Sequence, residues 1–487
     1  MPQTIRTTRN KGMKNPTIFQ GLVESVAFPN RGKVIPAVSE LSGKEVPAAG
    51  FSVSEVPPRA VQVKDVLPGQ TVEIFQSPHQ RRRHEGRLLR VVSPAGYEIP
   101  SPCPHAGFCG GCSYQTVPYD IQLEWKSDMV RSLLEEALPG SSFEFLPAAS
   151  SPLQFGYRNK MEFSFGDEYK GGPLALGLHK RGAYHDIVPV TGCQIVHPDF
   201  RLLVRCVLDY FAQTGAGFHN TRSHAGFLRH LVLRRSFTDG SVLVNLVTSS
   251  DGSLEEQDFV RHILDVSLSG AVTGILHTVN DSMADIVRPD GCRLLYGEPV
   301  LTENLLGLSF RLFPFSFFQT NTAGAEILYQ TALDMAGDLS GKTVFDLYCG
   351  TGTIAQLMAH AGASRVLGIE LVEEAVEAAR QNAEQNGLSN CSFLAGDVLK
   401  LVDTLEVRPD LIVLDPPRDG IHPKALPKIL SYRPEQFLYI SCKPTSLARD
   451  LPVFAEAGYC PVRVQCVDLF PGTVHVETVV LMSRENK

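Results

Sequence analysis

The sequence predicts an α/β protein in three parts: an N-terminal OB-like β-barrel, a central α+β domain and a C-terminal domain with a Rossmann-like, doubly wound sheet. Short β-rich runs broken by turns fill residues 17–100, longer strand-like runs alternate with turns over 101–300, and strands alternate with helices over 301–487. At 487 residues the chain is also too long for one ordinary core. The polar, basic residues 1–16 are predicted to form a disordered arm.

The predicted barrel depends on three β-rich runs with turn residues between them, at 61–63, 71–75 and 87–92. The segment 35–60 is rich in Pro, Ala, Ser and Gly, which predicts a long loop. The basic cluster 81–84 lies between two of the strands, where it could contact phosphate groups.

Hydrophobic periodicity assigns the elements of the other two parts. In the central part it predicts a helix over 117–138, ended by Pro139 and Gly140, and strands at 160–165, 228–234, 241–248 and 274–279. In the C-terminal part it predicts strands at 343–347, 365–369, 411–414 and 436–440, and helices at 353–361, 372–386 and 423–430.

The net charge of −7 is unevenly distributed. Residues 1–90 carry 14 Lys and Arg against 7 Asp and Glu, a net charge of +7, so the remainder carries −14. A basic module on an acidic body favours a nucleic-acid partner, the alternative being a solvated basic tail. No apolar run is long enough to span a membrane, no signal peptide is visible, and no obligate protein partner is indicated, so we expect a cytoplasmic protein.

A nucleotide-type turn follows the predicted strand 343–347. Gly350 and Gly352 let the backbone approach a ligand closely, and Glu370 ends the next strand 20 residues after Gly350, where a carboxylate can bind ribose hydroxyls. Asp397 is placed to contact an adenine edge, and Asp415 ends a further strand at the same edge of the sheet. This order favours S-adenosylmethionine.

The alternative ligand is a dinucleotide. That site requires a third glycine in the turn, and Gln356 occupies its position.

Two reactive side chains follow near the C-terminus. Cys442 lies on a tight turn after a strand, which makes its thiol a candidate nucleophile. Glu477 is a lone carboxylate in an apolar run, which makes it a candidate general base with a raised pKa. The alternatives are a structural cysteine and a salt-bridged glutamate. Beside a methyl donor, the pair indicates covalent catalysis on a uracil ring, whose C5 becomes nucleophilic once a thiolate adds at C6.

The chain has eleven cysteines, and disulfides are rare in cytosolic proteins, so a cluster of cysteines predicts metal binding or catalysis. Cys103, Cys109 and Cys112 follow a C-x5-C-x2-C spacing, and Cys193 is the best candidate for a fourth ligand. Four thiolates suit an iron–sulfur cluster or structural zinc, and spacing alone does not decide between them.

These residues resemble a known family, the bacterial RNA 5-methyluridine methyltransferases of class I, and within it the 23S ribosomal RNA uracil-C5 branch with a TRAM domain and an iron–sulfur cluster. The resemblance covers nearly the whole chain. Besides the four cysteines, its most specific segments are 157–160, 228–232, 318–321, 346–350, 415–418, 441–442 and 475–478.

The resemblance implies that Cys442 is the nucleophile, that Glu477 accepts the proton, and that the four cysteines hold a [4Fe–4S] cluster. It also implies that five side chains surround S-adenosylmethionine: Gln319, Tyr348, Glu370, Asp397 and Asp415. The sequence departs from the family at Lys443, where Asn is frequent, at Gly472, where His is common, and in the extra segment 35–60.

We therefore expect an enzyme that forms 5-methyluridine in RNA, with 23S ribosomal RNA as the substrate and a flipped-out target base. Arg229, Arg234 and Arg235 are candidates for RNA contact. The alternatives are a transfer RNA substrate, 5-methylcytosine formation, which usually needs two catalytic cysteines, and a non-catalytic RNA-binding assembly factor.

Overall fold

The computed structural model describes residues 16–37, 59–220, 222–283, 291–401 and 405–484, which form two compact units, 1–99 and 100–487. The predicted arm lies almost entirely outside the described residues, as does most of the predicted loop 35–60. No helix in the described ranges is long and apolar enough to cross a membrane.

The first unit contains a closed barrel with strand order β1-β2-β3-β5-β4. Its strands are β1 (Thr17–Ala27), β2 (Arg31–Pro36), β3 (Val61–Lys64), β4 (Thr71–Gln76) and β5 (Glu85–Ser93). Alternate residues of β1 to β4 point inward, so that the barrel core is built from valines, isoleucine and Phe19. The basic cluster 81–84 begins on a short helix, α1 (Pro78–Arg82), which starts with a capping box between Ser77 and Gln80.

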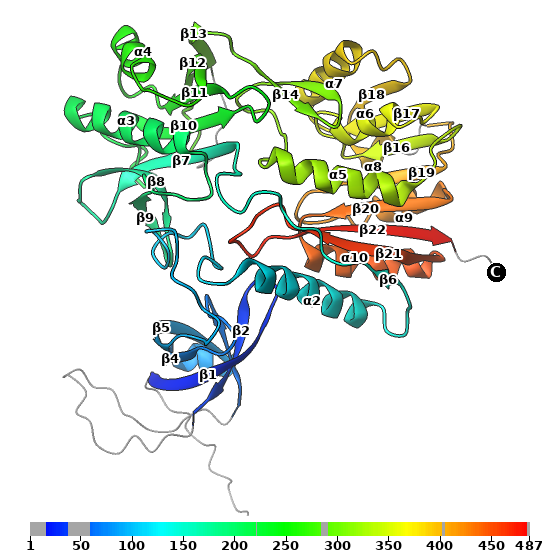
Figure 1. The fold of residues 1–487 in the computed structure, drawn as a ribbon, viewed down its shortest axis with the longest axis horizontal. Helices are drawn as coiled ribbons and strands as arrows, with labels where there is room; N and C mark the ends of the chain where they lie inside the picture. Colours follow the sequence, from blue (N-terminus) through cyan, green and yellow to red (C-terminus); the bar gives the residue numbers. More distant parts are fainter. Residues whose placement is uncertain (1–15, 38–58, 221, 284–290, 402–404, 485–487) are drawn as a thin grey trace, which may run out of the picture. The chain divides into compact units, whose positions relative to one another are not determined.

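The second unit contains a sheet with strand order β13-β12-β11-β10-β7-β8-β9, seven strands in the part of the chain that the structure describes. They are β7 (Lys160–Asp167), β8 (Leu174–Lys180), β9 (Ala183–Pro189), β10 (Leu228–Arg235), β11 (Ser241–Thr248), β12 (Ala271–Val279) and β13 (Gly291–Gly297). The helices α3 (Pro198–Thr214) and α4 (Glu256–Leu264) pack against each other and against this sheet (Figure 1).

The expected RNA contact through the arginines of β10 is wrong for two of them. Arg229 and Arg234 are buried, and their guanidinium groups donate to the carbonyls of Asn280 and Ser316. Arg235 is half-buried and donates to the Asp199 carboxylate. These side chains instead tie β10 to neighbouring segments, whose buried carbonyls and carboxylate need donors.

The C-terminal sheet has the strand order β18-β17-β16-β19-β20-β22-β21-β6, eight strands within the described residues. Its strands are β6 (Glu144–Phe145), β16 (Thr343–Leu347), β17 (Arg365–Glu370), β18 (Cys391–Ala395), β19 (Leu411–Leu414), β20 (Gln436–Ser441), β21 (Tyr459–Val467) and β22 (Glu477–Arg484). Its helices are α5 (Thr322–Ala336), α6 (Thr353–His360), α7 (Glu373–Gln385), α8 (Val398–Leu401), α9 (Leu426–Ser431) and α10 (Pro444–Glu456).

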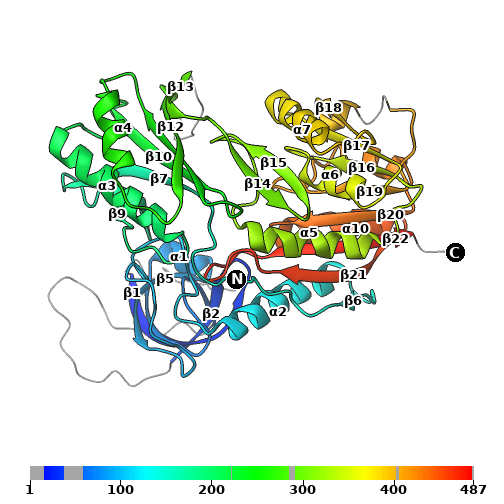
Figure 2. The ribbon, with the colours of Figure 1, turned by 45° about the horizontal axis from the view of Figure 1, so that its top comes forward.

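The parallel strands β16 to β20 confirm the predicted doubly wound α/β architecture. The strand order reverses between β16 and β19, and ligands bind at such a switch point outside the carboxyl ends of the strands. The hairpin of β14 (Leu301–Leu305) and β15 (Leu308–Leu312) lies between the two sheets in both ribbon views (Figures 1 and 2).

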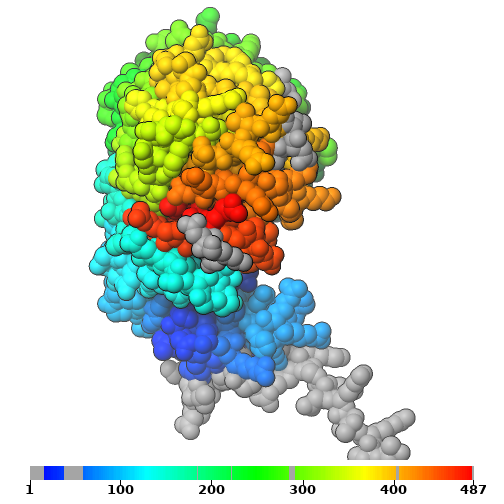
Figure 3. All heavy atoms as spheres, turned by 90° about the vertical axis from the view of Figure 1, so that its right-hand side faces the viewer, coloured from blue at the N-terminus to red at the C-terminus, as the bar shows by residue number. Residues whose placement is uncertain are grey.

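Residues 119–145 belong with the C-terminal sheet, although the sequence grouped them with the central part. The helix α2 (Tyr119–Ala137) packs against α10 and β21, and β6 pairs with β21 at the edge of the sheet. Figure 3 shows the cyan surface of this segment bordering the red surface of the last two strands. The burial of Met129, Val130 and Leu134 on one face of α2 explains this placement.

Candidate active site

The pairing of β20 with β22 brings the candidate nucleophile and the candidate base together. Ser441 lies directly opposite Thr478 in this antiparallel pair. Cys442 follows Ser441 and Glu477 precedes Thr478, so the thiol and the carboxylate occupy the next position across the same two strands. Asp415 follows the last residue of β19, which runs parallel to β20, so it lies at the same edge of the sheet.

Burial makes the carboxylates of this edge weak acids. Glu477 is 4% exposed, and burial, followed by the charge of Asp415, raises its pKa to about 8, while Arg418 opposes the change. Burial raises the pKa of Asp415 to about 7. The neutral forms of both groups are therefore substantially populated near neutral pH.

The Cys442 thiol lies in a tight turn between β20 and α10. The Ser441 hydroxyl donates to the Lys443 carbonyl (3.1 Å) and accepts from the Lys443 N–H (3.3 Å), and Pro444 then begins the helix. Burial, followed by the charges of Glu477 and Asp415, raises the pKa of Cys442 to about 11. Lys443 is the N-cap residue of α10 but makes no side-chain capping bond, so its departure from the family leaves the thiol's turn intact.

Two further residues of this edge were not assigned a role from the sequence. Arg418 lowers the pKa of both Cys442 and Glu477 through its charge. Burial, followed by the charges of Arg418, Lys126 and other cations, lowers the pKa of His475 to about 4, so its imidazole is neutral at pH 7. Their positions in the sequence could have identified them, since Arg418 follows Asp415-Pro416-Pro417 directly and His475 precedes Glu477 by two residues.

The glycine turn after β16 has the backbone geometry that the sequence predicted. Gly350 and Gly352 have φ of 53° and 74°, which favours glycine, and Tyr348 adopts φ of 71° beside them. A Cβ on Gly352 would lie 2.5 Å from the ring of Phe393, so a side chain there would also collide. The Gly350 N–H donates to the Glu370 carboxylate at 3.0 Å, which ties the turn to the end of β17.

The other residues predicted to bind S-adenosylmethionine lie along the same edge of the sheet. Burial and the charge of Asp397 raise the pKa of Tyr348 to about 12, which places those two side chains close together. Tyr329 is fully buried, and its pKa is raised by burial and then by Asp415, while a hydrogen bond to Gln319 lowers it. Tyr329 therefore connects Gln319 to the Asp415 end of the site.

A further carboxyl group, Asp346 on β16, completes the acidic lining. Burial and the charge of Asp415 raise its pKa to about 8, although a hydrogen bond from the backbone N–H of Ala355 lowers it. Buried acidic groups at the carboxyl ends of β16 and β19 suit a cationic ligand, because a positive charge would stabilise their ionised forms. These residues fit a sulfonium donor.

The four predicted metal-binding cysteines share one neighbourhood. All four are free thiols, with Cys103 and Cys193 buried and Cys109 and Cys112 half-buried. Burial, together with the charges of the other three thiols, raises the pKa of Cys112 to about 12, although a hydrogen bond with Gln115 lowers it. No group of three or more His, Cys, Asp or Glu among the described residues is arranged to hold a single metal ion.

His105 and His197 have other partners. The Gly192 N–H donates to the ring of His105, and His197 caps α3 by accepting from Asp199.

A cavity of about 320 Å³ lies against the central sheet. Its lining includes Ser164, His179, His185, Arg229 and His230. None of the predicted catalytic, donor or metal residues lines it, so its depth does not make it the active site.

Comparisons with known proteins agree with this geometry. The family model described as a methyltransferase domain matches residues 338–448, which include the glycine turn, Asp415 and Cys442. The chain is 44% identical over 443 residues to an uncharacterized RNA methyltransferase of Clostridium tetani, covering 91% of this chain and 96% of that one. It is 43% identical over 442 residues to one of Caldanaerobacter subterraneus subsp. tengcongensis, covering 91% and 97%.

A solved structure has a similar fold over nearly the whole chain. It is the Pyrococcus abyssi tRNA (uracil-54, C5)-methyltransferase in complex with S-adenosyl-L-homocysteine, with a TM-score of 0.70 and 23% identity, covering 95% of this chain and 100% of that one. The C-terminal part thus has the class I methyltransferase fold. The extent of similarity to the two bacterial relatives shows that the chain belongs to the RNA methyltransferase family.

The raised pKa of Glu477 predicts a pH-dependent stability. An unfolded glutamate ionises near pH 4.5, whereas the folded one ionises near 8, so the folded protein binds the extra proton between these values and loses stability as pH rises. Glu477→Gln cannot ionise, so its melting temperature should exceed the wild-type value by several degrees at pH 8 and by little at pH 5. Thermal unfolding at both pH values checks this, with the exposed Glu456→Gln as the control; equal differences at pH 5 and 8 would contradict it.

Proposed function

We propose that this protein is an S-adenosylmethionine-dependent RNA methyltransferase that forms 5-methyluridine, with Cys442 as the nucleophile and Glu477 as the base. The register of β20 and β22 carries the proposal, because it sets a thiol and a buried carboxylate across two adjacent strands beside the glycine turn. A structural cysteine and a salt-bridged glutamate would have no reason to share this edge.

In the first half of the proposed reaction, the thiolate of Cys442 adds to C6 of uracil, and the C5–C6 π electrons move toward O4. The resulting enolate is nucleophilic at C5, which forms a bond to the methyl group as the methyl–sulfur bond of the donor breaks. Arg418, whose charge lowers the pKa of Cys442, favours the thiolate.

In the second half, Glu477 takes the proton from C5, the C5–C6 double bond re-forms and the C6–sulfur bond breaks. A carboxylate whose pKa lies near 8 is a stronger base than an ordinary one, which suits the removal of a carbon-bound proton. Without that carboxylate, the methylated ring stays attached to Cys442.

S-adenosylmethionine supplies the methyl group as a sulfonium. The residues proposed to hold it are Gln319, Tyr348, Glu370, Asp397 and Asp415. Support comes from the two glycines of the turn, from the Gly350–Glu370 hydrogen bond, and from the buried acids that a positive charge would compensate.

Trapping with 5-fluorouridine tests the covalent step. Fluorine at C5 cannot leave as a proton does, so RNA carrying 5-fluorouridine should form a complex with the wild-type protein that survives denaturation. Cys442→Ala should lose the complex, whereas Cys206→Ala, which removes a half-buried thiol on α3, should keep it. A complex that persists in Cys442→Ala shows that another residue is the nucleophile.

We also propose that Cys103, Cys109, Cys112 and Cys193 hold a [4Fe–4S] cluster. The thiols are close neighbours, because the charges of neighbouring cysteines raise the pKa of Cys109, Cys112 and Cys193, and four thiolates suit an iron–sulfur cluster. Backbone N–H groups also donate to the sulfurs of Cys109 and Cys193, which stabilises thiolates.

Metal analysis distinguishes the two metals. Protein purified without oxygen should be brown and contain iron and acid-labile sulfide, and Cys112→Ser should lose most of both. The exposed Cys292→Ser on β13 is the control and should keep them. Colourless wild-type protein with one zinc per chain would show that the four cysteines bind zinc and not an iron–sulfur cluster.

The proposed substrate is 23S ribosomal RNA. Its support is the basic first unit, a barrel of the TRAM type in this proposal, combined with the cysteine site. Arg82 and Arg83 are exposed at the end of α1, where they can contact phosphates. Transfer RNA is the second candidate, because a protein of the same fold from Pyrococcus abyssi is a transfer RNA uracil-54 methyltransferase.

Methyl incorporation compares the two substrates directly. Protein-free 23S ribosomal RNA should take up one labelled methyl group per molecule from S-adenosylmethionine, recovered as 5-methyluridine, while unmodified transfer RNA takes up little. Cys442→Ala should label neither. Efficient labelling of transfer RNA alone would assign the second substrate, and labelling of cytosine would overturn the uracil chemistry.

A further inference from the structure

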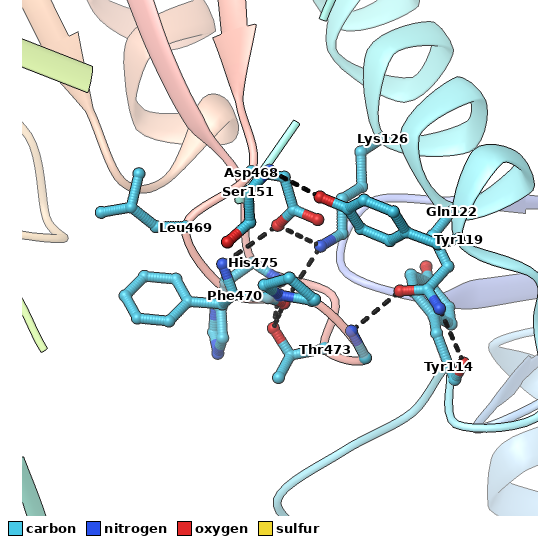
Figure 4. A network of polar contacts seen from close by, with 12 residues as sticks. Tyr114, Tyr119, Gln122, Lys126, Ser151, Asp468, Leu469, Phe470, Thr473 and His475 are labelled. Atoms are coloured by element: carbon cyan, nitrogen blue, oxygen red, sulfur yellow. Dashed lines mark hydrogen bonds and ion pairs between the residues drawn. The ribbon is translucent and has the colours of Figure 1, made fainter. Parts of the chain in front are cut away.

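A buried ion pair lies where α2 meets the connection 468–476 between β21 and β22. The Lys126 ammonium and the Asp468 carboxylate are 2.7 Å apart, and each side chain is 1% exposed (Figure 4). Such pairs add little net stability, because the cost of desolvating two charges offsets their attraction, and apolar replacements are often as stable. A reason other than stability is therefore needed for a charged pair at this position.

Both charges also bind the backbone of the connection. Asp468 accepts a hydrogen bond from the Phe470 N–H (3.0 Å), and Lys126 donates to the Phe470 carbonyl (3.2 Å). The pair thus binds both backbone polar groups of one residue, Phe470, which two apolar side chains cannot do.

Four consecutive carbonyls of the connection accept hydrogen bonds from four different parts of the chain. Their donors are Asn321 for Leu469 (2.8 Å), Lys126 for Phe470 (3.2 Å), Tyr157 for Pro471 (2.9 Å), and the N–H groups of Ser113 (3.0 Å) and Tyr114 (2.9 Å) for Gly472. The side-chain carbonyl of Gln122 also accepts a hydrogen bond from the Gly472 N–H at 2.8 Å.

Gly472 is required for this packing. Its φ is 78°, and a Cβ there would lie 2.7 Å from the amide of Gln115. Glycine stands here because the backbone has a positive φ and the turn that precedes α2 packs against it, which explains the departure from the histidine common in the family.

The fixed segment leads directly to the proposed base. Thr473 accepts from the His475 N–H, and the rings of His475 and Phe470 meet edge to face at 6.2 Å. The strand β22 then begins at Glu477, which pairs with Val467 immediately before Asp468. Both ends of the connection are therefore held, and the residue that follows it is Glu477, whose carboxylate must reach C5.

We propose that Lys126 and Asp468 are positioning residues for Glu477: by fixing the connection 468–476, they hold the carboxylate and His475 in place against the ring bound to Cys442. This inference rests on the proposed function. It assigns to α2, outside the methyltransferase sheet, a part in the second half of the reaction.

The test removes both charges together. Lys126→Met with Asp468→Leu leaves no unpaired buried ion, so the protein should fold and bind S-adenosylmethionine as the wild type does. Misplacement of a catalytic group by about 1 Å can lower a rate on the order of 10²-fold. We expect kcat to fall by about that factor, KM for RNA to change less than about threefold, and a denaturation-resistant adduct with ordinary uridine RNA to accumulate, as it should in Glu477→Gln.

Two further variants complete the experiment. Lys126→Met with Asp468→Asn keeps the acceptor for the Phe470 N–H without leaving an unpaired buried charge, and should show the same accumulation at a lower level. Asp199→Asn removes a buried, hydrogen-bonded carboxylate from the central part; it should lower the melting temperature without accumulating adduct.

Two outcomes separate this inference from the function on which it rests. If both double variants turn over within about twofold of the wild type and accumulate no adduct, the positioning role is wrong while the methylation stands. If the wild type makes no 5-methyluridine, the proposed function itself fails.

Discussion

Desolvation at the carboxyl edge of one sheet is the constraint on which the rest of this structure depends. Asp346, Asp415, Cys442 and Glu477 all lie where burial raises the pKa of an acid, and the charge of Asp415 raises the pKa of the other three. Water would remove these shifts, so the site requires rigid walls. A positive charge at this edge stabilises the ionised acids, and it can come from a protein side chain such as Arg418 or from a ligand.

The walls come from parts of the chain far from the methyltransferase sheet. The helix α2 and the segment after Cys112 reach the connection 468–476, and Asn321 reaches it from the start of α5. Residues separated by more than 300 positions therefore determine one backbone path. The connection between the last two strands of the methyltransferase sheet is therefore held by residues that precede this sheet in the chain.

Local patterns predicted the architecture, since alternation and turn residues are properties of short windows. The strands 343–347, 411–414 and 241–248 were predicted to the residue, and the glycine turn has the positive φ values that its sequence requires. Contacts between distant segments were not predictable. The sequence around Lys126 contains no pattern that predicts its ion pair with Asp468. The burial of Arg229 and Arg234 could not be predicted from the sequence of β10 alone.

The pairing of β20 with β22 also sets a length. Neighbouring strands lie about 4.8 Å apart, so the ladder between Ser441 and Thr478 acts as a ruler between the thiol and the carboxylate beyond it. A pyrimidine ring attached to the thiol through C6 presents its adjacent carbon over a comparable span. A slip of one residue in this ladder would turn Glu477 to the other face of the sheet, so the proposed chemistry depends on the hydrogen-bond register of two ordinary strands.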